Sequence, residues 1–380
     1  MKQYINSFLE VIVTLGVYAV TRLQSNLSRN LVGSWQVGGW QRRVIAKSMS
    51  FLLFVFFANV LFAQKSSLPL LSFARADSLN KPRVAAITGI AGGAYGGMLY
   101  FLTQLWYPKT ARSPFHYFDD RKEWLQMDKV GHTFGGYFES NWLAHAYQWA
   151  GVPRSKARWV GVTYGMLLQG TLEVLDGHSA KWGFSRSDIA ANTLGCSIYL
   201  AQEFAWSEQK ICMKVSNTPI NYSPSATVTS NDKQYTTTLK ARGNELYSNN
   251  YIQSFLKDYN AQTLWVSGNL HALLPEGNNV PEWLNLAVGY GAEHLYSGFD
   301  NGWEDEKTGA KFTYANNPHI PTRYRQYYLS FDIDLTRIKT KSPFLQTVLG
   351  GFNILKIPSP TLSYNTGGAD KGFRGYWMFF

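Results

Sequence analysis

DKVGHTFGGYFES at residues 128–140, QGTLEVLD at residues 169–176 and SRSDIAANTLG at residues 185–195 are the segments that decide the fold of this 380-residue chain. Each carries polar side chains at offsets of three, four or seven residues, and such side chains share one face of a helix. These side chains are Asp128, His132 and Glu139, then Gln169, Glu173 and Asp176, and finally Asp188 and Asn192. A carboxylate on an apolar helix surface is costly unless it meets a partner. We therefore expect the three polar stripes to face one another inside a helical bundle, where a functional site would lie.

The segments around these stripes predict a mainly α protein. Helices are expected at residues 84–107, 130–150, 159–175 and 188–203. The first has no charged residue and places Gly89, Gly93 and Gly97 on one face, where glycines four residues apart let another helix approach closely. It is the best transmembrane candidate in the chain, with a soluble buried helix as the alternative. The sequence thus predicts a Gly-rich, membrane-associated four-helix bundle at residues 83–206, followed by a C-terminal α+β domain containing antiparallel strands.

The chain after the predicted bundle is more polar. Residues 207–262 are expected to form a linker and a helix, because residues 216–238 are rich in Asn, Ser and Thr and residues 246–259 have a helical pattern. The apolar run at residues 344–357 predicts an interfacial helix or a hairpin that dips into a membrane.

A strand pattern marks residues 263–380, which we expect to form a domain of mixed structure. Apolar and polar side chains alternate from Tyr327 to Thr336, as in a half-buried antiparallel strand. Residues 264–270 and 284–290 show similar but shorter patterns. The C-terminal domain should therefore contain several antiparallel strands.

An export signal is predicted near the N-terminus. The run SFLLFVFFANVLFA follows basic residues and ends at Ala63 before a polar segment, as in a secretory signal peptide. It is shorter than the roughly twenty residues that a membrane span needs. A signal peptide at residues 49–63 would make residues 1–48 an overextended gene start and residues 64–82 a leader. The alternatives are a short buried or membrane helix at this run and a true cytoplasmic or membrane-associated extension before it.

Composition limits the partners of the chain. The net charge is +11, but Lys and Arg are scattered and no basic run is interleaved with aromatic residues, so we predict no binding of nucleic acid. A basic protein also suits an anionic lipid surface. The two cysteines, Cys196 and Cys212, leave a disulfide and buried thiols equally open, and their spacing does not suggest a zinc site.

The polar stripes have a structural interpretation. Asp128 and Asp188 could each cap a helix, and Ser185 with Asp188 resembles a capping box. His132 and Glu173 could form a buried pair that fixes the register of two helices. On this interpretation the cluster stabilises the fold and performs no chemistry.

A metal or acid-base site is the competing interpretation. Histidine nitrogen and carboxylate oxygen are suitable ligands for zinc, and a further carboxylate could act as a base on bound water. The candidate catalytic residues are His132, Glu173, Asp176 and Asp188, and the candidate metal ligands are these four with His178. No established catalytic motif supports this interpretation, because the chain has no His-Glu-x-x-His, nucleophile elbow or phosphate loop. A cavity that binds a lipid or another small ligand is a third interpretation.

Three motifs together resemble a known family. They are Asp128-Lys129-Val130-Gly131-His132, Glu173-Val174-Leu175-Asp176, and Phe184-Ser185-Arg186-Ser187-Asp188 continuing to Asn192 and Gly195. Over residues 122–203 the chain is similar to the YfiM-like proteins, domain of unknown function 2279. A weaker similarity links it to VanZ-like membrane proteins, although the glutamate-to-glutamine pair of that family is missing at Glu173.

The resemblance implies a putative lipoprotein of the Gram-negative cell envelope whose activity is unassigned. The lipoprotein label is not transferred, because no lipid-accepting cysteine follows the predicted signal. We predict an exported, periplasm-facing and membrane-associated protein, at the outer rather than the inner membrane, with a structural or ligand- and lipid-binding role. Membrane lipid and other envelope proteins are the expected partners. The alternative function is a metal-dependent hydrolase or transferase acting on an envelope lipid, glycan or peptide, with a divalent metal as the candidate cofactor.

Overall fold

The computed structural model describes residues 70–101, 112–248, 254–255, 257–317, 320–369 and 371–379. These residues belong to one compact unit, Asn59–Phe380. The predicted signal peptide at residues 49–63 and the predicted overextension at residues 1–48 lie outside the described residues.

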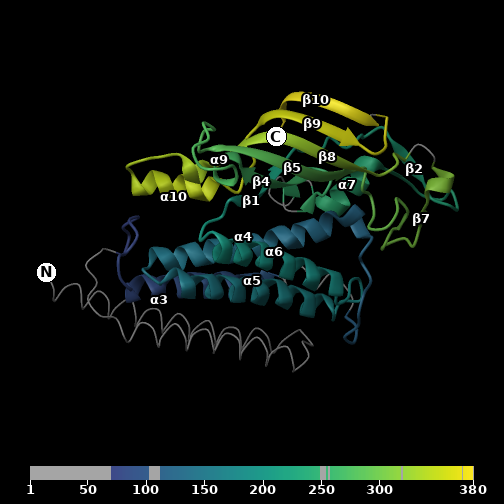
Figure 1. Ribbon diagram of the computed structural model, residues 1–380. Helices are drawn as coiled ribbons and strands as arrows, with labels where there is room; N and C mark the ends of the chain where they lie inside the picture. The colour runs from purple at the N-terminus through teal and green to yellow at the C-terminus, as the bar shows by residue number, and fades with distance from the viewer. Residues whose placement is uncertain are drawn as a thin grey trace. The chain divides into compact units, whose positions relative to one another are not determined.

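Helices α3 to α6 pack together as one layer (Figure 1). They are α3 (Lys81–Phe101), α4 (Met127–Trp149), α5 (Arg154–Asp176) and α6 (Arg186–Ala205), and the short 3-10 helix η3 (Glu123–Gln126) precedes α4. The hydroxyl of Tyr95 on α3 is 2.9 Å from that of Thr171 on α5. The hydroxyl of Thr88 on α3 is likewise 2.8 Å from that of Tyr147 on α4.

Glycines bring α4, α5 and α6 close to one another. A Cβ atom added at Gly136 would clash with the backbone of Asn192, and one at Gly195 would clash with the carbonyl of Thr133. A Cβ at Gly161 of α5 would clash in the same way with the carbonyl of Ser140. Only residues without a side chain permit this approach of two helix backbones. The polar stripes of the three helices are therefore held at short range.

The predicted glycine face of α3, unlike the glycines of α4, α5 and α6, is not closely packed against another described helix. A Cβ added at Gly93 or Gly97 would meet no atom within 4 Å. The described part of the chain thus supplies no close helix against these two glycines, and the packing role of Gly89, Gly93 and Gly97 stays a prediction.

A six-stranded antiparallel sheet forms the second layer (Figure 1). Its order is β1 (Ile211–Asn217), β4 (Gln262–Asn269), β5 (Leu284–Glu293), β8 (Tyr324–Ile333), β9 (Ser359–Asn365) and β10 (Gly372–Phe379). The layers meet where Met213 of β1 packs against Tyr137 and Tyr199 of the helices.

The sheet curls around a polar interior. Residues 354–356, which precede β9, pair with the free edge of β1 through Val215. The ring of Phe379 on β10 reaches across the inner face to Trp265 on β4, with a centroid separation of 6.2 Å. On that inner face the ammonium of Lys214 is 2.8 Å from Asp332, and both side chains are fully buried. The concave side of the sheet is therefore its polar side.

The remaining elements are short. They are β2 (Thr227–Thr229), β3 (Thr236–Thr238), α7 (Leu239–Tyr247), α9 (Leu270–Leu273), β6 (Trp303–Glu304), β7 (Lys311–Phe312), η4 (Tyr314–Asn316), η5 (Leu335–Arg337) and α10 (Pro343–Phe352). Strands β2 and β3 pair with each other, as do β6 and β7.

The prediction of a mainly α protein with a membrane-associated bundle is wrong, because the chain is a mixed α and β protein with a six-stranded sheet. Among the residues that the structure describes, none of the helices is both long and apolar enough to pass through a membrane. The polar residues on the inner face of the sheet made its strands look unlike buried core strands, so the sequence did not indicate how large the sheet is. Strand β1 also lies at the start of the stretch that was expected to be a linker.

The remaining local expectations have mixed outcomes. Cys196 and Cys212 are separate buried thiols, so no disulfide joins them. The apolar run after residue 343 forms α10, whose N-terminal cap is the hydroxyl of Ser342.

Candidate functional site

The site begins at a strained turn before α4. Trp124, Leu125 and Gln126 have φ angles of 50°, 50° and 66°, in the left-handed region that non-glycine residues rarely adopt. Contacts with the rest of the protein hold this turn: Trp124 donates its backbone N–H to Gly298 over 2.6 Å, and Tyr290 donates its hydroxyl to the carbonyl of Leu125. Such strain costs about 1–3 kcal/mol per residue and persists only where surrounding contacts impose it. Here it sets the direction in which α4 starts and so positions Asp128 and His132.

The start of α6 positions the second carboxylate. The hydroxyl of Ser185 caps this helix by accepting the backbone N–H of Asp188 over 2.9 Å. Ser185 also donates its hydroxyl to Asp120 over 2.7 Å, and its backbone N–H donates to Glu173 over 3.2 Å. Because Ser185 provides the cap, the carboxylate of Asp188 is not needed for capping. Asp128 does not cap α4 either, since that helix begins one residue earlier, at Met127.

Lys129 joins three carboxylates on one side of the site. Its ammonium lies 2.6 Å from Asp120, 2.8 Å from Asp128 and 2.5 Å from Asp188. In Asp128 and Asp188 this contact uses one carboxylate oxygen and leaves the other directed toward His132. One cation thus partly neutralises three anions and fixes their orientation.

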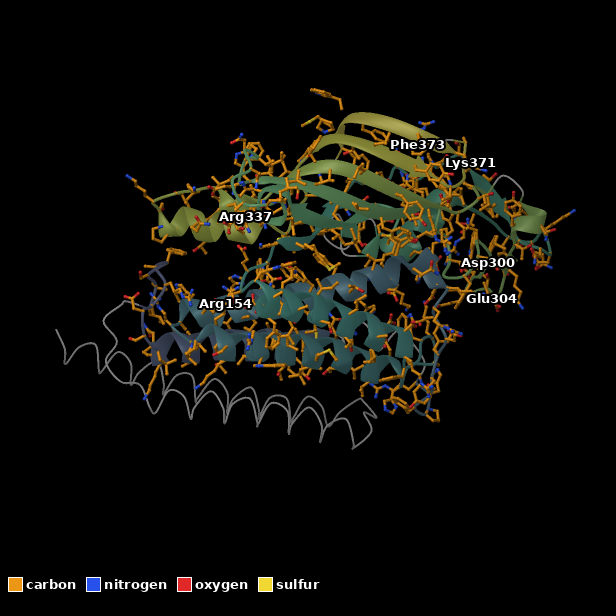
Figure 2. The ribbon with its side chains drawn as sticks, viewed as in Figure 1. Arg154, Asp300, Glu304, Arg337, Lys371 and Phe373 are labelled. Carbon is orange, nitrogen blue, oxygen red and sulfur yellow. The ribbon has the colours of Figure 1, made fainter. Side chains whose placement is uncertain are left out.

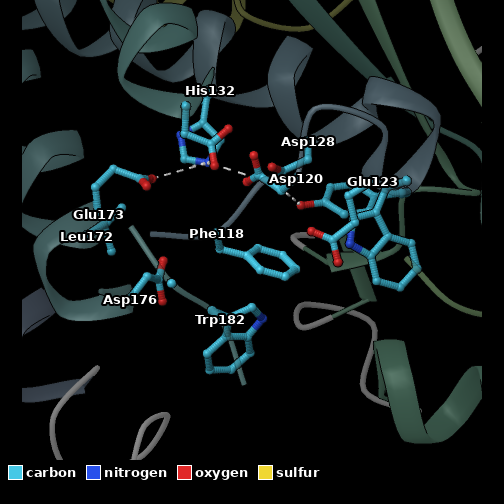
Figure 3. Close-up of a pocket in the computed structure, with 13 residues that line it drawn as sticks. Phe118, Asp120, Glu123, Asp128, His132, Leu172, Glu173, Asp176 and Trp182 are labelled. Atoms are coloured by element: carbon cyan, nitrogen blue, oxygen red, sulfur yellow. Dashed lines mark hydrogen bonds and ion pairs between the residues drawn. The ribbon is translucent and has the colours of Figure 1, made fainter. Parts of the chain in front are cut away.

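His132 lies among three carboxylates (Figure 3). Its Nε2 atom is 3.8 Å from Asp128 Oδ1, 3.8 Å from Glu173 Oε1 and 3.7 Å from Asp188 Oδ2. These separations are longer than a hydrogen bond. Its other nitrogen, Nδ1, lies 3.0 Å from the side-chain oxygen of Asn192, an acceptor for Nδ1–H when this nitrogen carries the proton of the neutral ring. The lone pair of Nε2 then points into the space between the three carboxylates.

One oxygen of Glu173 has no hydrogen-bond partner among the residues that the structure describes. The side chain of Glu173 is 1% exposed, and its Oε1 atom is buried without a hydrogen bond, whereas its Oε2 atom accepts from Ser185. A buried polar atom without a partner is rare, because its desolvation costs about 1–3 kcal/mol. The orphaned oxygen is the one that faces His132 Nε2.

Burial and mutual repulsion raise the pKa values of the carboxyl groups. Burial, with the charges of Asp188 and Asp176, raises the pKa of Glu173 to about 9. Burial and the charge of Asp128 raise the pKa of Asp188 to about 7. Without a further positive charge, some of these groups therefore hold protons at neutral pH.

A cavity of about 250 Å³ opens beside the cluster (Figure 3). Its lining combines acidic and aromatic side chains and comprises Phe118, Asp120, Glu123, Trp124, Asp128, His132, Leu172, Glu173, Asp176, Trp182, Gly183, Asp188 and Tyr259. Figure 3 shows Phe118 and Trp182 on the side of the cavity away from His132. Burial, followed by the charge of Asp128, raises the pKa of Glu123 to about 7. The cavity thus offers apolar walls and one strongly acidic end.

The structure brings five of the eight predicted cluster residues to this cavity: Asp128, His132, Glu173, Asp176 and Asp188. Asn192 lies behind them as the partner of His132. Gln169 lies apart and donates to Glu139 over 2.8 Å. His178 packs its ring against Phe115 and is not part of the cavity lining.

Sequence reasoning missed several residues of the site. Lys129, the central cation, stood inside a quoted motif, and its position one residue after Asp128 gave no reason to expect three ionic partners. Asp120 and Glu123 precede α4 in a segment without a helical pattern, so no periodicity could place them. Tyr259 donates its hydroxyl to Asp128 over 2.8 Å from far along the chain, and no local pattern signals such a contact.

The donor set fits a divalent cation. Asp128, His132 and Asp188 each offer one ligand atom, and the three atoms lie within 4.8 Å of one another. Ligands of a tetrahedral zinc ion lie about 3.4 Å apart, given zinc–ligand bonds of about 2.0–2.1 Å. The separations of 3.7–3.8 Å from His132 are a few tenths of an ångström longer than this, and the two carboxylate oxygens lie within 4.8 Å of each other. Glu173 approaches the same nitrogen and could supply a fourth oxygen.

These features define a mixed α and β protein whose helical layer holds an acidic, histidine-containing cluster beside a small cavity. Residues 116–202 match the model of the family DUF2279, described as a predicted periplasmic lipoprotein, which confirms the resemblance predicted from the sequence. That description is compatible with a protein exported to the cell envelope. Comparisons with curated proteins and with solved structures gave no match. The matched segment contains Asp128, His132, Glu173 and Asp188, but it includes neither Tyr259 nor the sheet.

Proposed function

We propose that this chain is a cell-envelope protein that binds one divalent cation, with zinc the best match to its ligands. Asp128, His132 and Asp188 hold the ion, and Glu173 completes the negative charge around it. The observation that carries the proposal is the arrangement at His132, whose Nε2 atom faces three carboxylate oxygens at 3.7–3.8 Å. Such an arrangement is poor for hydrogen bonds and suitable for a shared cation.

Charge supports the same proposal. Asp120, Asp128, Glu173 and Asp188 are four carboxylates, and among the described residues Lys129 is the one lysine that contacts this group. The raised pKa values of Glu173 and Asp188, caused first by burial and then by neighbouring negative charge, support the proposal, because protons and a cation would compete for the same space. A divalent ion would displace these protons, and binding would then strengthen as the pH rises.

Calorimetric titration of the full chain with zinc, after treatment with a chelator, tests the proposal. We expect binding at one site, and Asp188→Asn and His132→Ala should each weaken it at least about tenfold. Glu139→Gln is the matched control, because Glu139 is a buried carboxyl group on α4 outside the cluster. Absence of binding in the folded wild-type protein, or equal binding in Asp188→Asn, would leave the cluster as a structural ion network.

A metal-dependent hydrolase or transferase acting on an envelope component is the second candidate function. The observation in its favour is the cavity of about 250 Å³ beside the three ligands, with the orphaned Oε1 of Glu173 at its edge. A metal ion lowers the pKa of bound water, and a nearby carboxylate can accept the proton of that water. On this proposal Glu173→Gln retains zinc but loses hydrolysis of ester, amide or phosphodiester substrates. Loss of zinc and activity together would not support a separate role as the base.

The place of the protein within the envelope is also part of the proposal. Its position at the outer rather than the inner membrane, and contacts with other envelope proteins, stay predictions. Fractionation of cells that produce the full chain would test the first of these.

A further inference from the structure

The sheet carries apolar side chains on its exposed face and polar side chains on its buried face. In register, Val288 of β5 lies beside Leu329 of β8, which lies beside Leu362 of β9. These side chains are 56%, 45% and 45% exposed, while the neighbouring positions on the inner face, such as Ser330 and Ser363, are buried. A sheet with one face in water normally places its apolar side chains inward and its polar side chains outward. Here the apolar side faces outward over neighbouring strands.

A row of aromatic side chains lies beside the aliphatic row formed by Val288, Leu329 and Leu362. Tyr327 of β8 and Tyr364 of β9 pair with each other two residues along from Leu329 and Leu362, which is about 7 Å away, and Phe373 of β10 pairs with Tyr364. Phe373 is 73% exposed, and its ring centroid lies 4.9 Å from that of Tyr364. Aliphatic side chains flanked by Tyr and other aromatic side chains are typical of surfaces at the boundary between lipid tails and headgroups. We call these two rows, with Phe331, the outer sheet face.

The helical layer covers only the β1 end of this side of the sheet, where Met213 continues the row of Val288 and Leu329 through Val266. It meets the sheet near β1 and the ends of β4 and β5, through Met213 and through Tyr290. Figure 1 shows α4 to α6 on the β1 side of the sheet, away from β9 and β10. The apolar helix α10 adds exposed Phe344 and Phe352. Among the described residues, the outer sheet face has no covering element.

The charge around the face favours an anionic lipid surface as its partner. The basic residues after Asp334 include the exposed Lys341, Lys371 and Arg374. Of the others, Lys356 is buried, and Arg337 and Lys339 form ion pairs with Glu208 and Glu282. Figure 2 places Lys371 beside Phe373 at the β10 side of the sheet and Arg337 beside α10. A second copy of the chain is a poorer partner, because a symmetric contact would bring these basic rims together. Anionic headgroups instead attract basic residues.

From this geometry we propose that the outer sheet face docks on an anionic lipid bilayer, inserting its aliphatic and aromatic rows to the depth of the headgroups. The contact is peripheral and belongs to the sheet. It goes beyond the proposed cation site and does not depend on it.

Flotation of the full chain with phosphatidylcholine vesicles that contain phosphatidylglycerol tests this proposal. The wild-type protein should float with the vesicles, and the double variant Leu329→Gln with Leu362→Gln should bind at least about tenfold more weakly, because it removes two apolar contacts. The matched control is Leu167→Gln with Leu194→Gln, which changes two leucines of similar exposure (48% and 54%) on α5 and α6. The control should bind as well as the wild type.

Three results would overturn the proposal: a wild-type protein that does not float, a sheet variant that floats normally, or a control that loses binding. Sedimentation would then show whether the sheet variant disrupts a dimer, which would identify a second copy as the occupant. Lys341→Gln with Lys371→Gln separates the role of charge, because it should weaken binding to the anionic vesicles and leave binding to pure phosphatidylcholine unchanged. Zinc titration of the sheet variant should match the wild type, so failure of the lipid proposal is distinguishable from failure of the cation proposal.

Discussion

The inner face of the sheet and the cluster around His132 are both buried and charged, but they differ in balance. In the sheet, Lys214 and Asp332 form a one-to-one ion pair at 2.8 Å. Lys214 also donates to the carbonyl of Ile333, and Asp332 accepts from Ser267 and from the backbone N–H of Ile357. In the helical cluster, carboxylates outnumber cations and one Glu173 oxygen has no hydrogen-bond partner among the described residues.

This difference separates a supporting role from a binding role. A buried ion pair whose hydrogen bonds are complete has no remaining capacity for a ligand. A buried cluster with excess negative charge and an orphaned oxygen costs stability unless something arrives to complete it. We therefore expect mutations in the two assemblies to differ in how their effects depend on added cation.

The largest effect is expected at Asp332. Asp332→Ala leaves the ammonium of Lys214 buried without its partner, which should lower the free energy of unfolding by about 3–5 kcal/mol. Urea denaturation with and without zinc measures this loss, which should be the same under both conditions. The double variant Lys214→Met with Asp332→Leu should lose less, because no unpaired charge remains. A loss below about 1 kcal/mol in Asp332→Ala would show that the sheet does not need this pair.

The next effect concerns added cation at the helical cluster. Zinc at about a thousand times its dissociation constant should raise the free energy of unfolding of the wild-type protein by about 4 kcal/mol. Asp188→Asn should gain little from zinc, although without zinc it should be as stable as the wild type or more so, because an amide avoids burying a charge. If wild type and Asp188→Asn respond equally to zinc in urea denaturation, the cluster is not a cation site.

Glu139 shows what happens to a lone buried carboxyl group. Burial raises its pKa to about 8, with only Gln169 opposing the shift. Because the folded-state pKa exceeds the ordinary value of about 4.5, folding takes up a proton between pH 4.5 and 8, and stability falls as the pH rises through this window. Glu139→Gln cannot ionise, so its advantage over the wild type should grow from near zero at about pH 4 to roughly 1–3 kcal/mol above about pH 8. Parallel denaturation curves at all pH values would contradict the assigned pKa.

The smallest effect is expected on α3, which belongs to neither assembly. Gly93→Ala should raise the free energy of unfolding by at most about 1 kcal/mol, because alanine favours a helix and the added methyl group meets no atom within 4 Å. Gly195→Ala is the contrasting variant, since its methyl group would push α6 away from α4 and should cost about 1–3 kcal/mol. Thermal denaturation of both would show which glycines join helices. Destabilisation by Gly93→Ala would restore the packing role that the sequence suggested.

The sequence was informative wherever polar and apolar residues kept a helical or strand spacing through a whole segment. The stripes on α4, α5 and α6 predicted that Asp128, Glu173 and Asp188 would come together, since helical spacing leaves few other arrangements for buried carboxylates. Strand β8 (Tyr324–Ile333) overlaps the predicted alternation that began at Tyr327. Local pattern was sufficient for these features because each depends on one segment.

The sequence failed where a contact joins distant segments. The six-stranded sheet went unrecognised as a dominant feature because its inner face carries polar residues such as Lys214 and Asn285, which are typical of exposed positions. Likewise, Asp120 and Tyr259 enter the site only through tertiary contacts. Alternation shows that a strand has two unlike faces, but it does not show which face is buried.

The hydrogen bond from Tyr259 to Asp128 joins the site to a part of the chain outside the segment that matches the family. The segment that matches the family carries His132 and the three carboxylates around it, yet the hydroxyl that holds Asp128 comes from outside it. Tyr290 similarly fixes the turn before α4 from β5. A fragment cut to the matched segment would keep its candidate ligands and lose the two tyrosines that aim them. Residues outside the matched segment therefore act as a template for the helical site, and the structural unit that forms this site is larger than the segment that matches the family.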